Sequence, residues 1–260
     1  MLKRIISGVV GIPLLIFIVL YGDLPLYLAT MLVSLIGLGE FYHAMTFKEY
    51  NPISYIGYGV GIALLTIFYF SLNLELIFLL IFIATIILSG ILLYNSKHTI
   101  LDISVTLYGV LYVPLFLGHI ILTDKLNNSY IIWLIFIIAW ATDTFAYFGG
   151  CFFGKTKLCP SISPKKTVEG AISGILGSII VSSIFAYIFF IEYIVMVGFL
   201  GFFGSIIAQG GDLTASQIKR YVGIKDFGNL IPGHGGVLDR FDSILFTAPI
   251  VYYFFALLVK

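Results

Sequence analysis

Charged residues are scarce in this sequence. Lys, Arg, Asp and Glu make up 10% of its 260 residues, whereas a soluble domain carries about 25%. Hydrophobic residues make up 60%, and the mean hydropathy is +1.09. This balance excludes an ordinary soluble domain and indicates a membrane protein.

An excess of positive charge is missing too, and so is a set of cysteines. The formal net charge of +1 argues against a nucleic-acid partner, which would need a basic surface. Cys151 and Cys159 are too few for a disulfide framework. They could pair with each other, but the lysines around them indicate the reducing cytosolic side, so we expect two structural thiols.

A signal-peptide cleavage site is also absent. The first four residues, Met-Leu-Lys-Arg, precede an apolar run, as in a signal peptide. No small-residue cleavage motif ends that run, and further apolar runs follow at once. We therefore expect a retained first helix.

What the sequence does have is long apolar runs. A transmembrane helix needs about 20 mostly apolar residues. Candidate spans occupy residues 5–22, 24–45, 53–71, 74–94, 102–122, 130–149, 170–191, 193–211 and 243–259. The sequence therefore predicts an all-α, polytopic membrane protein of about nine transmembrane helices.

The distribution of Lys and Arg predicts the orientation. If these helices alternate from a cytosolic N-terminus, all of the 14 Lys and Arg except Lys125 and Lys260 fall on the inner side. Cytosolic loops carry such an excess of positive charge. We expect a cytosolic N-terminus and an outer C-terminus.

The few charges are concentrated in one stretch, residues 212–242, which we call the signature segment. It holds four carboxylates and four cations between two apolar runs, together with a Pro-Gly-His-Gly-Gly turn at 232–236. Carboxylates bind hard cations such as Mg²⁺, Lys and Arg bind phosphate, and glycines let backbone N–H groups approach an anion. This inventory indicates metal-assisted chemistry on a phosphorylated substrate.

The spacing within the segment is specific. Ser216-x-x-Lys219-Arg220, Lys225-Asp226, the 232–236 turn and Asp239-Arg240-x-Asp242 resemble the signature of the phosphatidate cytidylyltransferase family. The resemblance implies that CTP and phosphatidate react to give CDP-diacylglycerol and pyrophosphate. It implies Mg²⁺ on Asp212 and Asp239, with a second cation left open. The catalytic candidates are Asp212, Ser216, Lys219, Arg220, Lys225, Asp226, Asp239, Arg240 and Asp242.

Candidate substrate-binding residues lie in the signature turn and outside the segment. Asp143 lies about 9 Å inside the cytosolic end of the 130–149 helix, where a carboxylate needs a partner or water. Residues 163–170 resemble a second patch of the same family, in which Lys165 or Lys166 is free to reach a triphosphate and Thr167 caps the next helix. The full set is Asp143, Lys155, Lys165, Lys166, His234, Gly235 and Gly236, with His234 as a turn residue or phosphate donor.

Two geometric expectations complete the site. If the 193–211 helix continues past Asp212, Ser216, Lys219 and Arg220 share one face with it. The ends of the sixth, eighth and ninth helices then bring carboxylates to one depth, a cluster that needs cations. Glu40, at the inner end of the second helix, is expected to snorkel to the interface.

The sequence also allows other interpretations of these residues. The charges could form a purely structural network, or the chain could be a related CTP-dependent enzyme such as a polyprenol kinase or CDP-archaeol synthase. A cation or phosphate transporter would place its charges near the bilayer midplane; here they gather at one face. We expect CTP, phosphatidate and membrane lipid as partners, with a homodimer left open.

The same reading gives the domain organisation and location. We expect one integral membrane domain over 1–260, with 1–129 mainly scaffold and 130–260 carrying the catalytic helices and loops. We expect a bacterial cytoplasmic membrane protein whose active site faces the cytosol.

Overall fold

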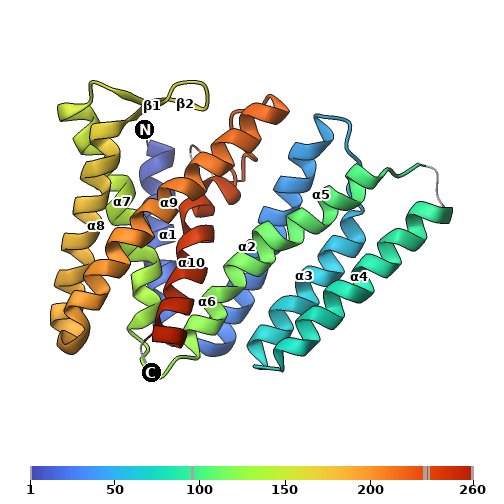
Figure 1. The fold of residues 1–260 in the computed structure, drawn as a ribbon, viewed down its shortest axis with the longest axis horizontal. Coiled ribbons are helices and arrows are strands. Elements are labelled where there is room, and N and C mark those ends of the chain that lie inside the picture. Colours follow the sequence, from blue (N-terminus) through green and yellow to red (C-terminus); the bar gives the residue numbers. More distant parts are fainter. Residues whose placement is uncertain (1, 95–96, 231–232, 234, 259–260) are drawn as a thin grey trace. The chain divides into compact units, whose positions relative to one another are not determined.

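The computed structural model describes residues 2–94, 97–230, 233 and 235–258, and this part of the chain is almost wholly helical (Figure 1). The helices are α1 (Leu2–Tyr21), α2 (Asp23–Thr46), α3 (Ser54–Tyr69), α4 (Leu74–Tyr94), α5 (Ile100–Val110), α6 (Phe116–Asp124), α7 (Ile131–Phe153), α8 (Val168–Phe189), α9 (Ile194–Val222) and α10 (Leu238–Leu258). A π-helical turn, η1 (Leu111–Leu115), joins α5 to α6, and a 3₁₀ turn, η2 (Ile191–Tyr193), precedes α9.

The helices have the length and apolarity of membrane spans. Among the described residues, seven helical segments are long and apolar enough to cross a membrane, and two shorter apolar helices cover Gly11–Tyr21 and Ser54–Tyr69. This confirms a helical, multi-pass membrane protein. Each predicted apolar range overlaps a helix, while the number of nine spans and the orientation of the termini stay predictions.

Two helices extend beyond their apolar cores. α9 continues to Val222, as the shared face of Asp212 and Ser216 requires. α10 begins at Leu238, five residues before the predicted 243. Asp239 and Asp242 therefore lie inside a helix, in its first two turns.

One element was not expected in an all-α protein. β1 (Lys157–Cys159) and β2 (Ser163–Thr167) form a short antiparallel hairpin, in which Lys157 pairs with Thr167 and Cys159 with Ser163. The hairpin connects α7 to α8 (Figure 1). Both cysteines are free thiols.

The chain divides into two compact units. Unit 1 comprises Met1–Lys125 and Tyr221–Arg240, and unit 2 comprises Leu126–Arg220 and Phe241–Lys260. The first boundary lies close to the expected division at 129, but part of the signature segment belongs to unit 1. The expectation of a single domain stays a prediction.

Unit 1 packs α2, α3 and the α5–α6 segment around a common core. Leu64, Leu65 and Phe68 of α3 are buried with Ile121 of α6. Pro114 lies in η1, because a proline cannot donate the next helical hydrogen bond and the π turn accommodates that loss.

Unit 2 packs α7 tightly on α8 through small residues. A methyl group on Gly170 would lie 2.7 Å from the Ala146 carbonyl oxygen, and one on Gly174 would lie 2.9 Å from that of Thr142. Small residues four apart let two membrane helices approach this closely. Thr142 Oγ1 also donates to Ser205 Oγ of α9 at 2.9 Å, which fixes α7 against α9.

Candidate functional site

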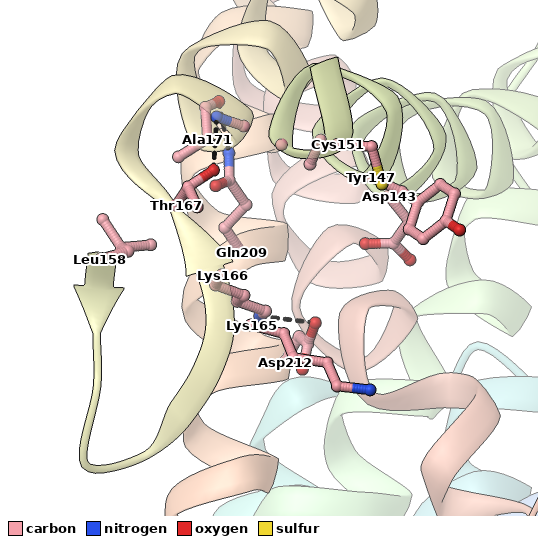
Figure 2. A pocket seen from close by; sticks show the side chains of 13 residues that line it. Asp143, Tyr147, Cys151, Leu158, Lys165, Lys166, Thr167, Ala171, Gln209 and Asp212 are labelled. Atoms are coloured by element: carbon pink, nitrogen blue, oxygen red, sulfur yellow. Dashed lines mark hydrogen bonds and ion pairs between the residues drawn. The ribbon is translucent and has the colours of Figure 1, made fainter. Parts of the chain in front are cut away.

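A cavity of about 360 Å³ lies in unit 2, enclosed by α7, the hairpin, α8 and α9 (Figure 2). Its size is within the range of small-molecule sites, roughly 300–1,000 Å³. Its lining combines apolar and polar side chains with small residues: Asp143, Ala146, Tyr147, Gly150, Cys151, Leu158, Lys165, Lys166, Thr167, Gly170, Ala171, Gln209 and Asp212.

An ion pair between β2 and α9 stands in this cavity. Lys166 Nζ lies 2.6 Å from Asp212 Oδ2, and each side chain is 27% exposed. Ser216 Oγ, one turn further along α9, donates to Asp212 Oδ1 at 3.3 Å. The predicted shared face of Asp212 and Ser216 is therefore confirmed. Lys165 lines the cavity beside Asp212 (Figure 2).

A second carboxylate group comes from α7 and α10. Ser243 Oγ lies 3.5 Å from both Asp143 oxygens, and the Ser243 N–H donates to Asp242 Oδ1 at 2.8 Å. α9 passes close to Asp242, because a methyl group on Gly211 would lie 2.7 Å from the Asp242 carbonyl oxygen. Three helices of unit 2 thus bring carboxylates into one neighbourhood, as expected. Within the described residues, no three His, Cys, Asp or Glu side chains form a ready-made metal cage.

The hairpin that carries the two lysines is fixed to α8 at its base. Thr167 Oγ1 accepts the Gly170 N–H at 3.1 Å, which confirms the predicted cap. The Glu169 carboxylate accepts the backbone N–H groups of Lys155 and Thr156, each at 3.1 Å. Glu169 therefore holds the start of the hairpin.

The end of α9 contacts the tip of the same hairpin. Arg220 is exposed, and its Nε donates to the Ile162 carbonyl oxygen at 3.3 Å. Lys219 is buried in the same turn of α9, at 8% exposure. Lys155 and Lys157 are exposed and do not line the cavity.

The rest of the signature segment lies in unit 1. Asp239 is buried, and its Oδ2 accepts the N–H of Phe227 at 2.8 Å and the N–H of Gly236 at 2.9 Å. One carboxylate oxygen thus joins the backbone at Phe227 to the backbone at Gly236. Because the Gly236 N–H donates to Asp239, it is committed to the protein rather than presented to an anion.

The remaining signature residues of unit 1 are more exposed. Lys225, Asp226 and Arg240 are exposed, and Gly235 has a φ of 88°, a conformation that favours glycine. A methyl group on Gly235 would lie 2.9 Å from Asp239 Oδ2. Pro232 and His234 lie outside the described residues.

Glu40 does not snorkel, contrary to the sequence-based expectation. Its Oε1 accepts the Val237 N–H at 2.9 Å, and its Oε2 accepts the Leu238 N–H at 2.8 Å. The first turn of a helix leaves N–H groups without helical partners, and a carboxylate is a favourable partner there. Val237 offers no capping oxygen of its own, so Glu40 of α2 supplies one from about 200 residues away.

The cavity residues that were not predicted as site residues include Tyr147, Thr167 and Gln209. Gln209 Nε2 donates to the Ala171 carbonyl oxygen at 3.2 Å and so links α9 to α8. An amide in an apolar helix, three residues before Asp212, was the signal available for it.

Known proteins of one family match this chain along nearly its whole length. The model of the cytidylyltransferase family matches residues 2–258. A phosphatidate cytidylyltransferase of Bacillus subtilis is 32% identical over 269 aligned residues, which cover 99% of this chain and 98% of the relative. One from Synechocystis sp. is 36% identical over 286 aligned residues, with 99% and 97% covered. One from Rickettsia bellii is 42% identical over 168 aligned residues, with 62% and 72% covered.

These matches span both units, and the signature segment lies within the matched range. The chain therefore belongs to the cytidylyltransferase family and is a nucleotidyltransferase.

Proposed function

We propose that this protein transfers the cytidylyl group of CTP to phosphatidate, giving CDP-diacylglycerol and pyrophosphate. The observation that carries the proposal is the unit 2 cavity, in which Lys165, Lys166 and Asp212 meet. It supplies cations for a triphosphate and a carboxylate for a metal in one place. The two near-full-length relatives bear the name of this activity.

The reaction needs charge more than it needs a base. An oxygen of the lipid phosphate attacks the α-phosphorus of CTP, and the bond from that phosphorus to the bridging oxygen breaks as pyrophosphate leaves. The attacking group is already anionic, since such monoesters have a second pKa of about 6. The protein must therefore offset repulsion between two phosphates and stabilise the departing pyrophosphate.

The hairpin lysines are suited to hold the triphosphate. Lys165 is exposed and Lys166 is half-buried, and both line the cavity. In the structure Lys166 pairs with Asp212, so its ammonium is held at the cavity before any ligand binds. We assign Lys165 and Lys166 to CTP, because a lysine of this kind exchanges a carboxylate for a phosphate oxygen without moving its backbone.

Mg²⁺ suits the carboxylates of the signature. Mg²⁺ in phosphate-handling enzymes commonly uses one or two carboxylates and completes its shell with phosphate oxygens and water, so a three-residue cage is not required. Asp212 lines the cavity and has an exposed portion. A carboxylate has about four lone-pair sites, so the two amide contacts of Asp239 do not exhaust it.

We propose Asp212 and Asp239 as metal ligands and leave a second cation open. When bound, the metal would supply charge stabilisation on the pyrophosphate leaving group. We propose that four cations bind the reacting phosphates: Lys219, Arg220, Lys225 and Arg240. Three further side chains are proposed to orient these cations and Asp212: Ser216, Asp226 and Asp242. His234 and Gly235 are proposed to donate to phosphate from the turn.

The proposed setting follows the positive charge. With nine spans and a cytosolic N-terminus, Lys165 and Arg220 face the cytosol, where CTP is available, while phosphatidate arrives from the bilayer. The bacterial relatives support a bacterial cytoplasmic membrane.

The test is direct. Purified protein is incubated with CTP, Mg²⁺ and phosphatidate in mixed micelles, and pyrophosphate release and the lipid product are both measured. We expect stoichiometric CDP-diacylglycerol and pyrophosphate, and no turnover when a polyprenol replaces phosphatidate. Turnover on the polyprenol with release of CDP would instead identify a CTP-dependent kinase and overturn the proposal.

A further inference from the structure

Glu40 lies in α2, in the half of the chain that the sequence assigned to scaffold, yet it contacts the signature directly. Its two oxygens accept the N–H groups of Val237 and Leu238, at the start of α10. Both partners and Glu40 belong to unit 1. α2 thus contributes a side chain to the turn that precedes Asp239.

Two glycines of the signature segment make room for this carboxylate. A methyl group on Gly228 or on Gly236 would overlap the Glu40 side chain. Neither glycine has the positive φ that alone would call for glycine. A side chain at either position would therefore require the Glu40 carboxylate to move.

Glu40 and Asp239 divide the amides of this turn between them. The Gly236 N–H donates to Asp239, and the next two N–H groups along the chain donate to Glu40. Successive N–H groups at a helix start carry positive partial charge, so the two carboxylates hold the backbone of residues 236–238 at the start of α10. The orientation of the Asp239 side chain then depends on the backbone that Glu40 fixes.

α2 and the loop after it also hold the other end of the unit 1 portion of the signature. Tyr50 and Tyr221 share a hydroxyl–hydroxyl hydrogen bond of 2.6 Å, and Lys48 Nζ lies 5.5 Å from the centre of the Tyr221 ring. The segment 221–240 is therefore anchored near both ends by residues between 40 and 50.

We propose that Glu40 is a positioning residue for the cytidylyl transfer: it fixes the first turn of α10, and through that turn it orients Asp239. This inference rests on the proposed function for its kinetic consequence. Its structural part, that Glu40 holds the backbone at the start of α10, stands on the hydrogen bonds alone. Glu40 is not a catalytic residue, because its oxygens are turned to the backbone.

Glu40→Gln is the informative change. Glutamine keeps the shape but has one acceptor oxygen, and its amide group would face a backbone donor. Where a hydrogen bond to a charged acceptor is needed in the transition state, its loss lowers the rate about 10- to 100-fold. We expect kcat to fall about 10- to 100-fold while the KM for CTP changes less than about 3-fold, since the cavity lysines lie in unit 2.

Two further variants separate positioning from general stability. Glu49→Gln removes the same charge from an exposed site shortly after α2, and should leave kcat unchanged. Glu40→Asp keeps both acceptor oxygens on a shorter side chain and should recover part of the lost kcat. If Glu40→Gln does not fold, Gly228→Ala leaves Glu40 in place and pushes a methyl group against its carboxylate.

Amide hydrogen exchange of the ligand-free proteins supplies a readout independent of activity. In Glu40→Gln, peptides covering 227–238 should exchange faster, while those covering 155–167 should not change. Faster exchange in both segments, or a kcat loss that follows the loss of folded protein, would show a stabilising role only and overturn the proposal. Unchanged kcat with a loosened turn would overturn it equally.

Failure of the proposed function would look different from failure of this inference. Wild-type protein that releases no pyrophosphate from CTP and phosphatidate would refute the reaction. The exchange difference at 227–238 would still be present if Glu40 holds the turn, and absent if it does not.

Discussion

The hairpin that ends at Thr167 and residues 236–239 at the start of α10, which we call the turn, are held in the same way. In each, one glutamate accepts two backbone N–H groups: Glu169 those of Lys155 and Thr156, Glu40 those of Val237 and Leu238. They differ in range, because Glu169 is 13 or 14 residues from its partners and Glu40 is 197 or 198. A polar segment next to an apolar bundle is thus fixed either locally or from a distant helix.

The two segments also present their charges differently. The hairpin carries Lys165 and Lys166 at the edge of a cavity, where their ammonium groups can exchange partners. The turn buries Asp239 at 7% exposure with its oxygen already bound to two amides. We interpret the hairpin as the adaptable, ligand-binding segment and the turn as the preset one.

The largest expected effect tests the preset segment. Asp239→Asn exchanges a buried anionic acceptor for a neutral amide, which weakens both N–H contacts and removes a hard ligand for Mg²⁺. We expect kcat to fall by more than about 100-fold and the free energy of unfolding to fall by about 1–3 kcal/mol. Activity at saturating Mg²⁺ and a denaturant titration measure the two effects.

Asp212→Asn provides the matched comparison in the adaptable segment. Asp212 is partly exposed and its partners are side chains, so we expect a similar loss of kcat with a change in unfolding free energy of less than about 1 kcal/mol. If both variants keep wild-type activity at low Mg²⁺, neither aspartate is a metal ligand. Equal losses of stability would contradict the distinction between the two segments.

Lys166→Ala is expected to act mainly on binding. It removes one charge-assisted contact with the triphosphate, so the KM for CTP should rise about 10- to 30-fold, with a smaller change in kcat. Lys157→Ala, on the same hairpin but exposed and outside the cavity lining, is the control and should leave both constants unchanged. A pure kcat effect at Lys166 would place it at the reacting phosphates instead.

How much of this organisation was predictable depends on the range of the interaction. The helices followed from apolar runs, and the Thr167 cap followed from residues within one turn. The extension of α9 entered only as the condition for a shared face of Asp212 and Ser216. Glu40 was seen as an unusual charge in an apolar helix, but its partner lies nearly the whole chain away, and periodicity contains no information on such pairs. The ion pair of Lys166 with Asp212 belongs to the same class.

The missed hairpin has a different physical reason. The stretch 157–167 is short and contains two prolines, and its apolar and polar residues alternate too little to predict strands. Glu169 and Thr167 fix the base of this loop at the start of α8, and a strand pattern contains no information on these contacts. Tertiary contacts, rather than strand propensity, make this element.

Glu169→Gln is the counterpart of Glu40→Gln in the hairpin. The change weakens the hold on Lys155 and Thr156 at an exposed loop, so we expect the KM for CTP to rise about 3- to 10-fold with kcat nearly unchanged. Steady-state kinetics on the two glutamate variants measures the contrast. If Glu169→Gln instead lowered kcat and spared the KM, the hairpin and the turn would not have separate roles.

The smallest expected effect concerns the hydrogen bond between Tyr50 and Tyr221. Tyr50→Phe removes an exposed hydrogen bond to Tyr221 and keeps the ring. Exposed contacts of this kind contribute well under about 1.5 kcal/mol, so kcat should change less than about 2-fold.

The hydrogen bond to Tyr221 raises the pKa of Tyr50 above its ordinary value of 10.0. A raised pKa means that the contact is intact below pH 10 and is lost as the pH rises beyond it, so the pH profile between about 6 and 9 should match the wild type. If Tyr50→Phe lowered kcat as much as Glu40→Gln does, the hydrogen bond to Tyr221 would be as important as the contacts of Glu40. That result would contradict the positioning role assigned to Glu40 alone.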